Sequence, residues 1–176
     1  MLTPVVIPKA TPAKKVPGYP MPEDDGNLVS WEFVATQMDQ ARHYWLSTVS
    51  PTGRPHAVPV WGIWCENRFH FEGSMQTAWA RHLVRNPNIV VHVPDGEKVV
   101  ILEGVARTIE DDEIDAQAWE RLDSAFQAKY QVAEGSPYWV VEPRKVLAWD
   151  GEELHNMTRW VFDWSAGRED ATTATG

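Results

Sequence analysis

The sequence predicts a mainly β fold, an antiparallel barrel or sandwich with about three inserted helices. About six or seven short segments are rich in β-branched and aromatic residues, as strands are. Most of them follow one another with a short turn between, as at Asp95-Gly96, and consecutive hairpins build antiparallel sheet. Such strands close into a barrel or pack as a sandwich because closure removes exposed edges. A chain of 176 residues suits one compact domain.

The order of residue types along the chain divides it into three parts. Prolines recur through residues 1–27, which predicts an extended arm rather than a packed element, with room to lie across a partner subunit. Residues 28–164 carry the predicted strands and helices and form the domain. Residues 165–176 are expected to be a disordered tail.

Helical spacing and end signals mark the helices. Ser30 is a good N-cap for a helix to about residue 42. A second helix, 77–85, ends where Asn86-Pro87 blocks continuation. A third begins in the acidic residues 111–113, which suit the positive end of a helix dipole, and runs to about Tyr130. The predicted strands span residues 44–50, 55–66, 68–73, 88–93, 99–110, 138–149 and 158–164.

Composition limits the partners. The net charge of −9 argues against a nucleic-acid or anionic-membrane surface, which needs clustered Lys and Arg. Cys65 is the only cysteine, and neither a signal peptide nor a long apolar run is present, so we expect a cytoplasmic protein. The ten tryptophans suit an aromatic core, a subunit interface or a site for a flat ligand, and core packing must account for most of them.

Common catalytic motifs are missing from the sequence. It has no G-x-G-x-x-G, P-loop, H-E-x-x-H or cysteine pair, and its six histidines are scattered, so no metal site is expected. No serine has an elbow motif, and Cys65 in its strand context resembles a packed residue more than a thiolate. We assign no catalytic side chain; if the protein is an enzyme, a bound cofactor supplies the reactivity.

Two segments are candidate binding sites. The helix that follows the Gly73-Ser74 turn opens with Thr77 and carries Arg81, and a helix start with hydroxyls and an arginine suits a phosphate, although a simple cap is the commoner role. The strand ending in Trp61-Gly62 would let a flat ligand approach its backbone, although on spacing alone core packing with a bulge is the favoured explanation.

At these segments the sequence resembles the pyridoxamine 5'-phosphate oxidase-like, FMN-binding split-barrel superfamily, including its flavin and deazaflavin oxidoreductase branch. The matching stretches keep the family's order and together cover roughly residues 30–164. They are residues 44–49, 53–56, 59–61, 69–73, 77–83 with Asn86-Pro87, and 158–162.

The resemblance implies a six-stranded antiparallel split β-barrel, a homodimer, and a cofactor in each groove between subunits. The flavin ring would rest against Val58, Pro59, Val60, Trp61 and Gly62. The phosphate would lie near Ser74, Thr77, Trp79, Arg81 and His82. Trp149, Arg159 and Trp160 would cover the ring from the other subunit.

One position departs from the family pattern. Trp79 stands where the oxidases have a phosphate-binding lysine, and loss of a cation there costs about 1.5–3 kcal/mol unless Arg81 compensates. This leaves room for FMN, for the deazaflavin coenzyme, or for an empty groove. The leading hypothesis is hydride transfer between such a cofactor and a small-molecule substrate; the alternative is a flavin-, deazaflavin- or haem-binding protein for storage or sensing.

Overall fold

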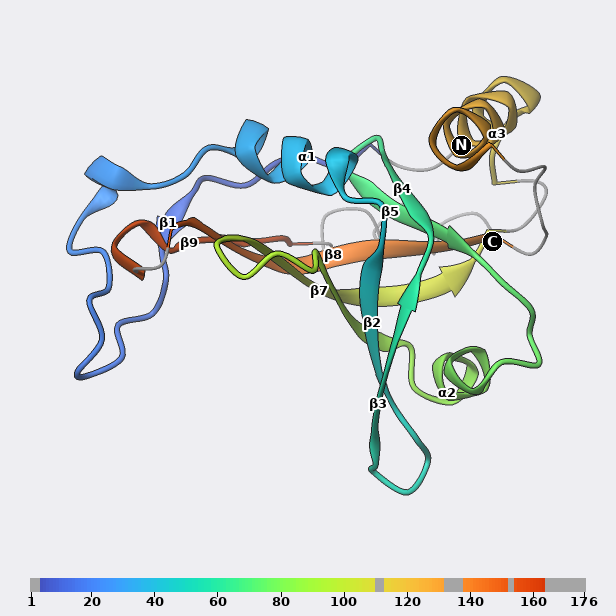
Figure 1. Ribbon diagram of the computed structural model, residues 1–176, viewed down its shortest axis with the longest axis horizontal. Coiled ribbons are helices and arrows are strands. Elements are labelled where there is room, and N and C mark those ends of the chain that lie inside the picture. Colours follow the sequence, from blue (N-terminus) through green and yellow to red (C-terminus); the bar gives the residue numbers. More distant parts are fainter. Residues whose placement is uncertain (1–3, 110–112, 132–137, 152–153, 164–176) are drawn as a thin grey trace, which may run out of the picture.

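The computed structural model describes residues 4–109, 113–131, 138–151 and 154–163. In these residues nine strands, three α-helices and two short 3-10 helices form a mainly β fold (Figure 1). The strands are β1 (Thr11–Pro12), β2 (Tyr44–Val49), β3 (Pro55–Val60), β4 (Gly62–Cys65), β5 (Arg68–Glu72), β6 (Asn88–His92), β7 (Lys98–Thr108), β8 (Tyr138–Asp150) and β9 (Thr158–Val161). The helices are α1 (Trp31–Gln40), α2 (Ala78–Arg85), α3 (Ala116–Tyr130), η1 (Asp25–Asn27) and η2 (Leu154–Asn156).

Every strand pair is antiparallel, and the long strand β8 joins two parts of the sheet. One edge of β8 pairs with β7, while β5 and β9 pair with its first and last parts respectively. From β7 the ladder passes through β6 and β2 to β3, and the chain of β3 continues into β4, which pairs with β5. The circuit of neighbours therefore returns to β8, as in a barrel.

The nine strands exceed the six of the barrel that the resemblance implies, and they exceed the seven predicted strand segments for two local reasons. The predicted strand 55–66 is interrupted at Trp61, so it forms β3 and β4. In the N-terminal arm, Thr11 and Pro12 pair with Arg159 and Thr158 of β9 and add β1. The expected antiparallel architecture with three helices is confirmed.

The arm packs on its own chain more than its proline content predicts. Thr11 Oγ1 donates a hydrogen bond to the carbonyl of Arg159 (3.0 Å), and the amide of Ala13 donates one to the carbonyl of Met157 (2.9 Å). Ala13 and Met21 are buried. Proline is tolerated here because β1 is an edge strand.

Gly62 allows the chain to turn between β3 and β4. A Cβ atom at this position would lie 2.3 Å from the ring of Phe69 and 2.7 Å from the carbonyl oxygen of His70. The space beside Gly62 is thus filled by β5, which corrects the expectation that this glycine leaves room for a ligand to reach the backbone.

Most of the tryptophans with described side chains serve the core, as composition indicated. Trp160 is 1% exposed and meets the ring of Trp31 edge-on, with centroids 5.3 Å apart. Trp79 and Trp139 pack with Phe71 inside the barrel. A second apolar cluster lies between α3 and the sheet and includes Ile63, Leu122 and Phe126.

The caps of α1 and α2 lie at the predicted residues, and that of α3 does not. The hydroxyl of Ser30 accepts a hydrogen bond from the amide of Phe33 (3.2 Å). The hydroxyl of Thr77 accepts one from the amide of Ala80 (3.3 Å). For α3 the cap is Asp115, which accepts from the amide of Ala118 (2.8 Å). The predicted start at 111–113 was therefore too early, and residues 110–112 lie outside the described ones.

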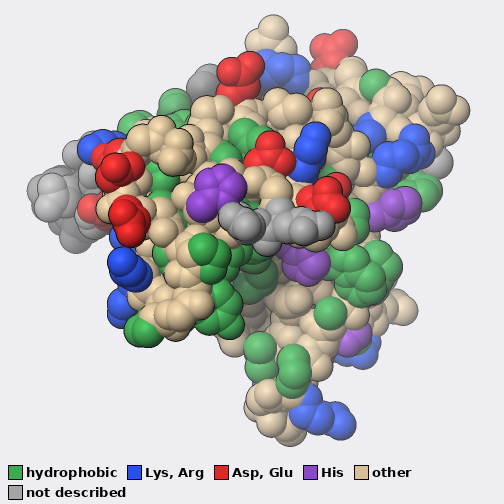
Figure 2. All heavy atoms as spheres, turned by 60° about the vertical axis from the view of Figure 1, so that its left-hand side comes forward, with side chains coloured by type: hydrophobic (Ala, Val, Ile, Leu, Met, Phe, Trp, Pro, Cys, Tyr) green, Lys and Arg blue, Asp and Glu red, His purple; other side chains and the backbone are tan. Residues whose placement is uncertain are grey.

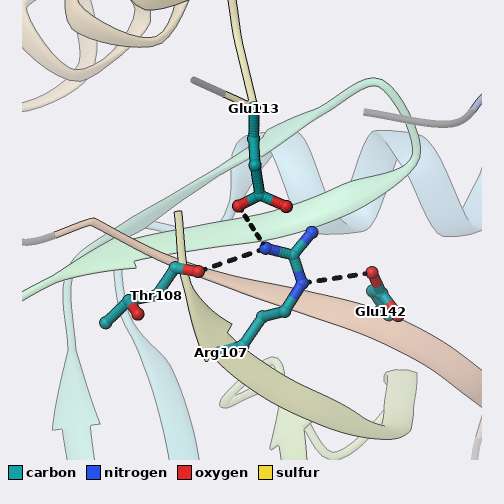
Figure 3. A network of polar contacts seen from close by, with 4 residues as sticks. All are labelled: Arg107, Thr108, Glu113 and Glu142. Atoms are coloured by element: carbon teal, nitrogen blue, oxygen red, sulfur yellow. Dashed lines mark hydrogen bonds and ion pairs between the residues drawn. The ribbon is translucent and has the colours of Figure 1, made fainter. Parts of the chain in front are cut away.

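Glu113 instead joins a polar network before α3. Nη1 of Arg107 lies 2.6 Å from Glu113 Oε2 and 3.1 Å from the carbonyl oxygen of Thr108, while its Nε lies 3.4 Å from Glu142 Oε1 (Figure 3). Arg107 belongs to β7 and Glu142 to β8, so this guanidinium ties the approach to α3 to two paired strands.

Replacing Gly62 by alanine tests the close approach at the turn. Because the added methyl would overlap Phe69 and the His70 carbonyl, we expect Gly62→Ala to lower the free energy of unfolding by about 1–3 kcal/mol in urea denaturation. Gly96→Ala is the matched control, since nothing lies within 4 Å of its Cβ position. Equal stability of the two variants would contradict this account.

Candidate functional site

The start of α2 presents hydroxyl groups and one exposed arginine. Ser74 Oγ accepts from the amide of Gln76 (3.2 Å), and Thr77 Oγ1 donates to the carbonyl of Ser74 (2.9 Å). The guanidinium of Arg81 is exposed and donates to the carbonyl of Gln76. Three of the predicted phosphate-site residues therefore lie together at the surface, at the positive end of the helix dipole.

His82 faces the barrel and belongs to a small polar group. Its Nδ1 lies 3.0 Å from Oγ1 of the buried Thr48 of β2, and its ring lies edge-on to His56 of β3, with centroids 5.4 Å apart. The sequence analysis did not single out Thr48 or His56. Both come next to His82 because β2 and β3 pair at Thr48 and His56 directly beneath α2.

Trp79 points away from this surface. It is 6% exposed, and its ring packs against Phe71 and Trp139. A Cβ atom added at Gly73 would lie 2.7 Å from Cζ2 of this ring. The Trp79 side chain therefore fills the core beneath the Gly73 turn. Any anion at the helix start meets neither a cation nor an aromatic ring from position 79.

The predicted ring-binding strand is half exposed. Val58 and Val60 are partly buried against the core, while Pro59 is exposed and Trp61 is 42% exposed. Gly62 is buried. Within the described residues β3 pairs only with β2, so its other edge is open beside Trp61.

Tyr130 of α3 fixes the turn that carries Trp61. Its hydroxyl oxygen accepts from the amide of Gly62 (2.9 Å) and lies within donating distance of the carbonyls of Gly62 (2.8 Å) and Arg42 (3.1 Å). The rings of Trp61 and Tyr130 are stacked, with their centroids 4.9 Å apart and an angle of 12° between their planes. One face of Trp61 is thus covered by Tyr130, a residue that sequence reasoning took only as the end of a helix.

A second pair of residues reinforces this corner. Nζ of Lys129 donates to the carbonyl of Asp39 (2.7 Å) and to the hydroxyl of Tyr44 (2.7 Å), which in turn donates to the carbonyl of Met38. Burial lowers the pKa of Lys129 to about 8 and raises the pKa of Tyr44. These groups hold α3 against the end of α1.

The three residues expected to cover the ring from a second subunit lie at the far side of this chain. Trp149 and Arg159 are partly exposed on β8 and β9, whereas Trp160 is buried among core rings. In Figure 1 β9 and α2 occupy opposite sides of the molecule. Within one chain these residues do not meet the start of α2.

Beneath α3 lies a buried polar pair that the sequence analysis did not use. Arg68 is 1% and His70 2% exposed. Burial, with a smaller effect of the Arg68 charge, lowers the pKa of His70 to about 3. The imidazole is therefore neutral in the folded protein at ordinary pH.

The described residues contain no group of three or more His, Cys, Asp or Glu placed to hold a metal ion. Burial, followed by the Glu66 charge, raises the pKa of Cys65, which disfavours a thiolate. No α-helix of the described ranges is long and apolar enough to span a bilayer. On the face in Figure 2, basic side chains are interspersed with acidic ones.

Comparison with known proteins identifies relatives by sequence model and by structure. Residues 31–156 match the sequence model of the family described as pyridoxamine 5'-phosphate oxidase. No curated protein sequence matches the chain.

Three solved structures share the fold at low sequence identity. A conserved hypothetical protein, Rv2991, from Mycobacterium tuberculosis is 21% identical, with a TM-score of 0.59 over 71% of this chain and 88% of the other. A haem-binding protein from Mycobacterium smegmatis is 22% identical, with a TM-score of 0.59 over 73% of this chain and 55% of the other. An FMN-binding, pyridoxamine 5'-phosphate oxidase-related protein from Nostoc punctiforme is 19% identical, with a TM-score of 0.51 over 76% of this chain and 90% of the other.

Replacing Tyr130 tests the clamp on the turn. Tyr130→Phe keeps the ring but leaves the buried Gly62 amide without its acceptor, so we expect a loss of about 1–3 kcal/mol in the free energy of unfolding. Tyr19→Phe, at a position 59% exposed, is the control and should change stability by less than about 0.5 kcal/mol. A Tyr130→Phe protein as stable as this control would refute the clamp.

Acid sensitivity tests the buried imidazole. Because the pKa of His70 lies below that of an unfolded histidine, the unfolded chain binds the proton first, and stability is lost as pH falls from about 6.5 toward 3. His70→Gln should lower the slope of unfolding free energy against pH by up to about 1.4 kcal/mol per unit between pH 5.5 and 4. An unchanged slope in His70→Gln would show that this imidazole does not titrate on unfolding.

Proposed function

Because the chain belongs to the pyridoxamine 5'-phosphate oxidase family, we propose that it is a homodimeric oxidoreductase that uses FMN, or the deazaflavin coenzyme, on a small-molecule substrate. The observation that carries this proposal is the exposed Arg81 beside the Ser74 and Thr77 hydroxyls at the start of α2. It is a local donor site for an anion on a chain of net charge −9.

The residues at the helix start fit one phosphate group. Arg81 has a carbonyl as its present partner, and a phosphate would replace that neutral acceptor by a charged one. The hydroxyls of Ser74 and Thr77 can turn outward to donate, since hydroxyl protons rotate. With Trp79 in the core, Arg81 carries the charge pairing from this turn of the helix, so affinity for a phosphorylated flavin depends on it.

The exposed edge of β3 fits the ring. Trp61 offers the face that Tyr130 does not cover, and the unpaired backbone of β3 offers amide and carbonyl groups to the polar edge of the ring. A bound flavin or deazaflavin would supply the hydride acceptor or donor. This chain would bind the phosphate at Arg81, hold the ring at Trp61 and exclude water from the exposed strand when a substrate stacks there.

A second subunit would complete the site. The exposed Trp45 and Trp61 are apolar surface of the kind that subunit interfaces cover, and the open edge of β3 beside them has unpaired backbone groups. Trp149 of a second copy would then close the groove from the other side.

The second candidate function is binding without turnover, for storage or sensing of a flavin, a deazaflavin or haem. The imidazoles of His56 and His82, close together beside the proposed site, favour it, because histidine is a common axial ligand of haem. One structural relative is a haem-binding protein from Mycobacterium smegmatis.

The visible absorption spectrum separates these functions. We expect the purified protein to acquire a flavin band on titration with FMN or the deazaflavin coenzyme and to be reduced by a hydride donor. A band with haem alone, or a bound flavin that no donor reduces, would favour storage or sensing.

Removing the Arg81 charge tests the phosphate site. Arg81→Ala should weaken FMN binding tenfold or more, which corresponds to about 1.5–3 kcal/mol, and leave riboflavin affinity nearly unchanged, because riboflavin lacks the phosphate. Arg85→Ala, one turn further along the same helix and also exposed, is the matched control. Equal losses for FMN and riboflavin, measured by calorimetry, would rule out the assigned role.

A further inference from the structure

A separate cavity lies between the N-terminal arm and strands β8 and β9. Its volume is about 470 Å³, within the range of small-molecule sites. Most of its wall is apolar, with Val16 and Met21 from the arm facing Leu147 and Met157. In Figure 1 the arm and β9 lie on the side of the molecule away from α2.

One cation in this cavity has a nitrogen atom without a partner in the described part of the chain. Arg159 lines the wall, and its Nε is buried without an acceptor among the described residues. In the β8–β9 ladder it stands opposite Leu147, so both side chains project from the same face of the sheet. A buried N–H without an acceptor is unfavourable, and a movement of the Arg159 side chain that brings this group to a bound anion would remove that penalty.

The neighbouring charges add to this preference. Lys14 lines the cavity from the arm and is exposed. Lys145 also lines it but already pairs with Glu103 at 2.6 Å. On a chain of net charge −9, Arg159 and Lys14 create a second local site for one negative group, apart from the one proposed at Arg81.

The rim of the cavity is unusually apolar for a surface. Val16 is 46% and Tyr19 59% exposed, so an occupant with an apolar body would cover surface that now meets water. A planar guanidinium binds a carboxylate through two parallel hydrogen bonds. We propose that this cavity binds an amphipathic carboxylate, with its charged head on Arg159 and Lys14 and its apolar body between the arm and β8. This site is independent of the proposed flavin site.

Calorimetric titration with decanoate, octanoate and decanol tests the proposal. Decanoate should bind, octanoate should bind more weakly by about fourfold for each missing methylene, and decanol about tenfold more weakly than decanoate. Arg159→Met should weaken decanoate tenfold or more without weakening decanol. Lys14→Met should weaken decanoate several-fold, and Lys15→Met, at a neighbouring exposed lysine outside the cavity wall, should have no effect.

Val16→Glu is a second variant, in which the substituted residue is exposed rather than buried. Its carboxylate at the exposed rim should repel decanoate and reduce its affinity tenfold or more. No measurable decanoate binding, equal losses of decanoate and decanol in Arg159→Met, or equal effects of the two lysine variants would each overturn the proposal. Displacement of decanoate by saturating FMN would overturn the independence of the two sites, whereas failure of FMN to bind would leave the decanoate result unaffected.

Discussion

The close approach of β5 to Gly62 is the constraint on which the site depends. Only a residue without a side chain lets the Phe69 ring and the His70 carbonyl lie so near the backbone, and this contact allows β3 to turn into β4. The turn connects the β2–β3 part of the sheet to β5 and β8, so it decides where Trp61 stands. Tyr130 then fixes the turn through hydrogen bonds to both backbone groups of Gly62.

Local signals in the sequence were sufficient to predict most of the helices and strands and the first residues of two helices. Ser30 and Thr77 cap their helices as predicted, since a cap depends only on residues within the next turn. The start of α3 was placed too early because the acidic residues 111–113 offered an equally good signal, whereas the cap is Asp115, two residues further along the chain. The β3–β4 interruption could not be placed by pattern, because the close contact at Gly62 comes from another strand.

The candidate site was predictable in part for the same reason. Ser74, Thr77 and Arg81 are near one another in sequence, and the structure keeps them together at the surface. Trp79 belongs to the same helix turn, but helical periodicity sends it to the opposite face, where it joins Phe71 and Trp139. Tyr130 is 68 residues from Gly62, and no local pattern announces such a contact. The histidine pair likewise requires the register of β2 and β3.

The pairing of β1 with β9 joins the first and last strands of the described chain. During synthesis on a ribosome the arm emerges before the other strands, and its partner strand β9 emerges only after the strands between them have been made. Until then Ala13 and the residues beside it have no strand to pair with, so their apolar surface stays open to chaperones. Closure of this edge therefore follows the synthesis of the strands between β1 and β9, and it forms the wall of the cavity beside β8 only after β9 has been made.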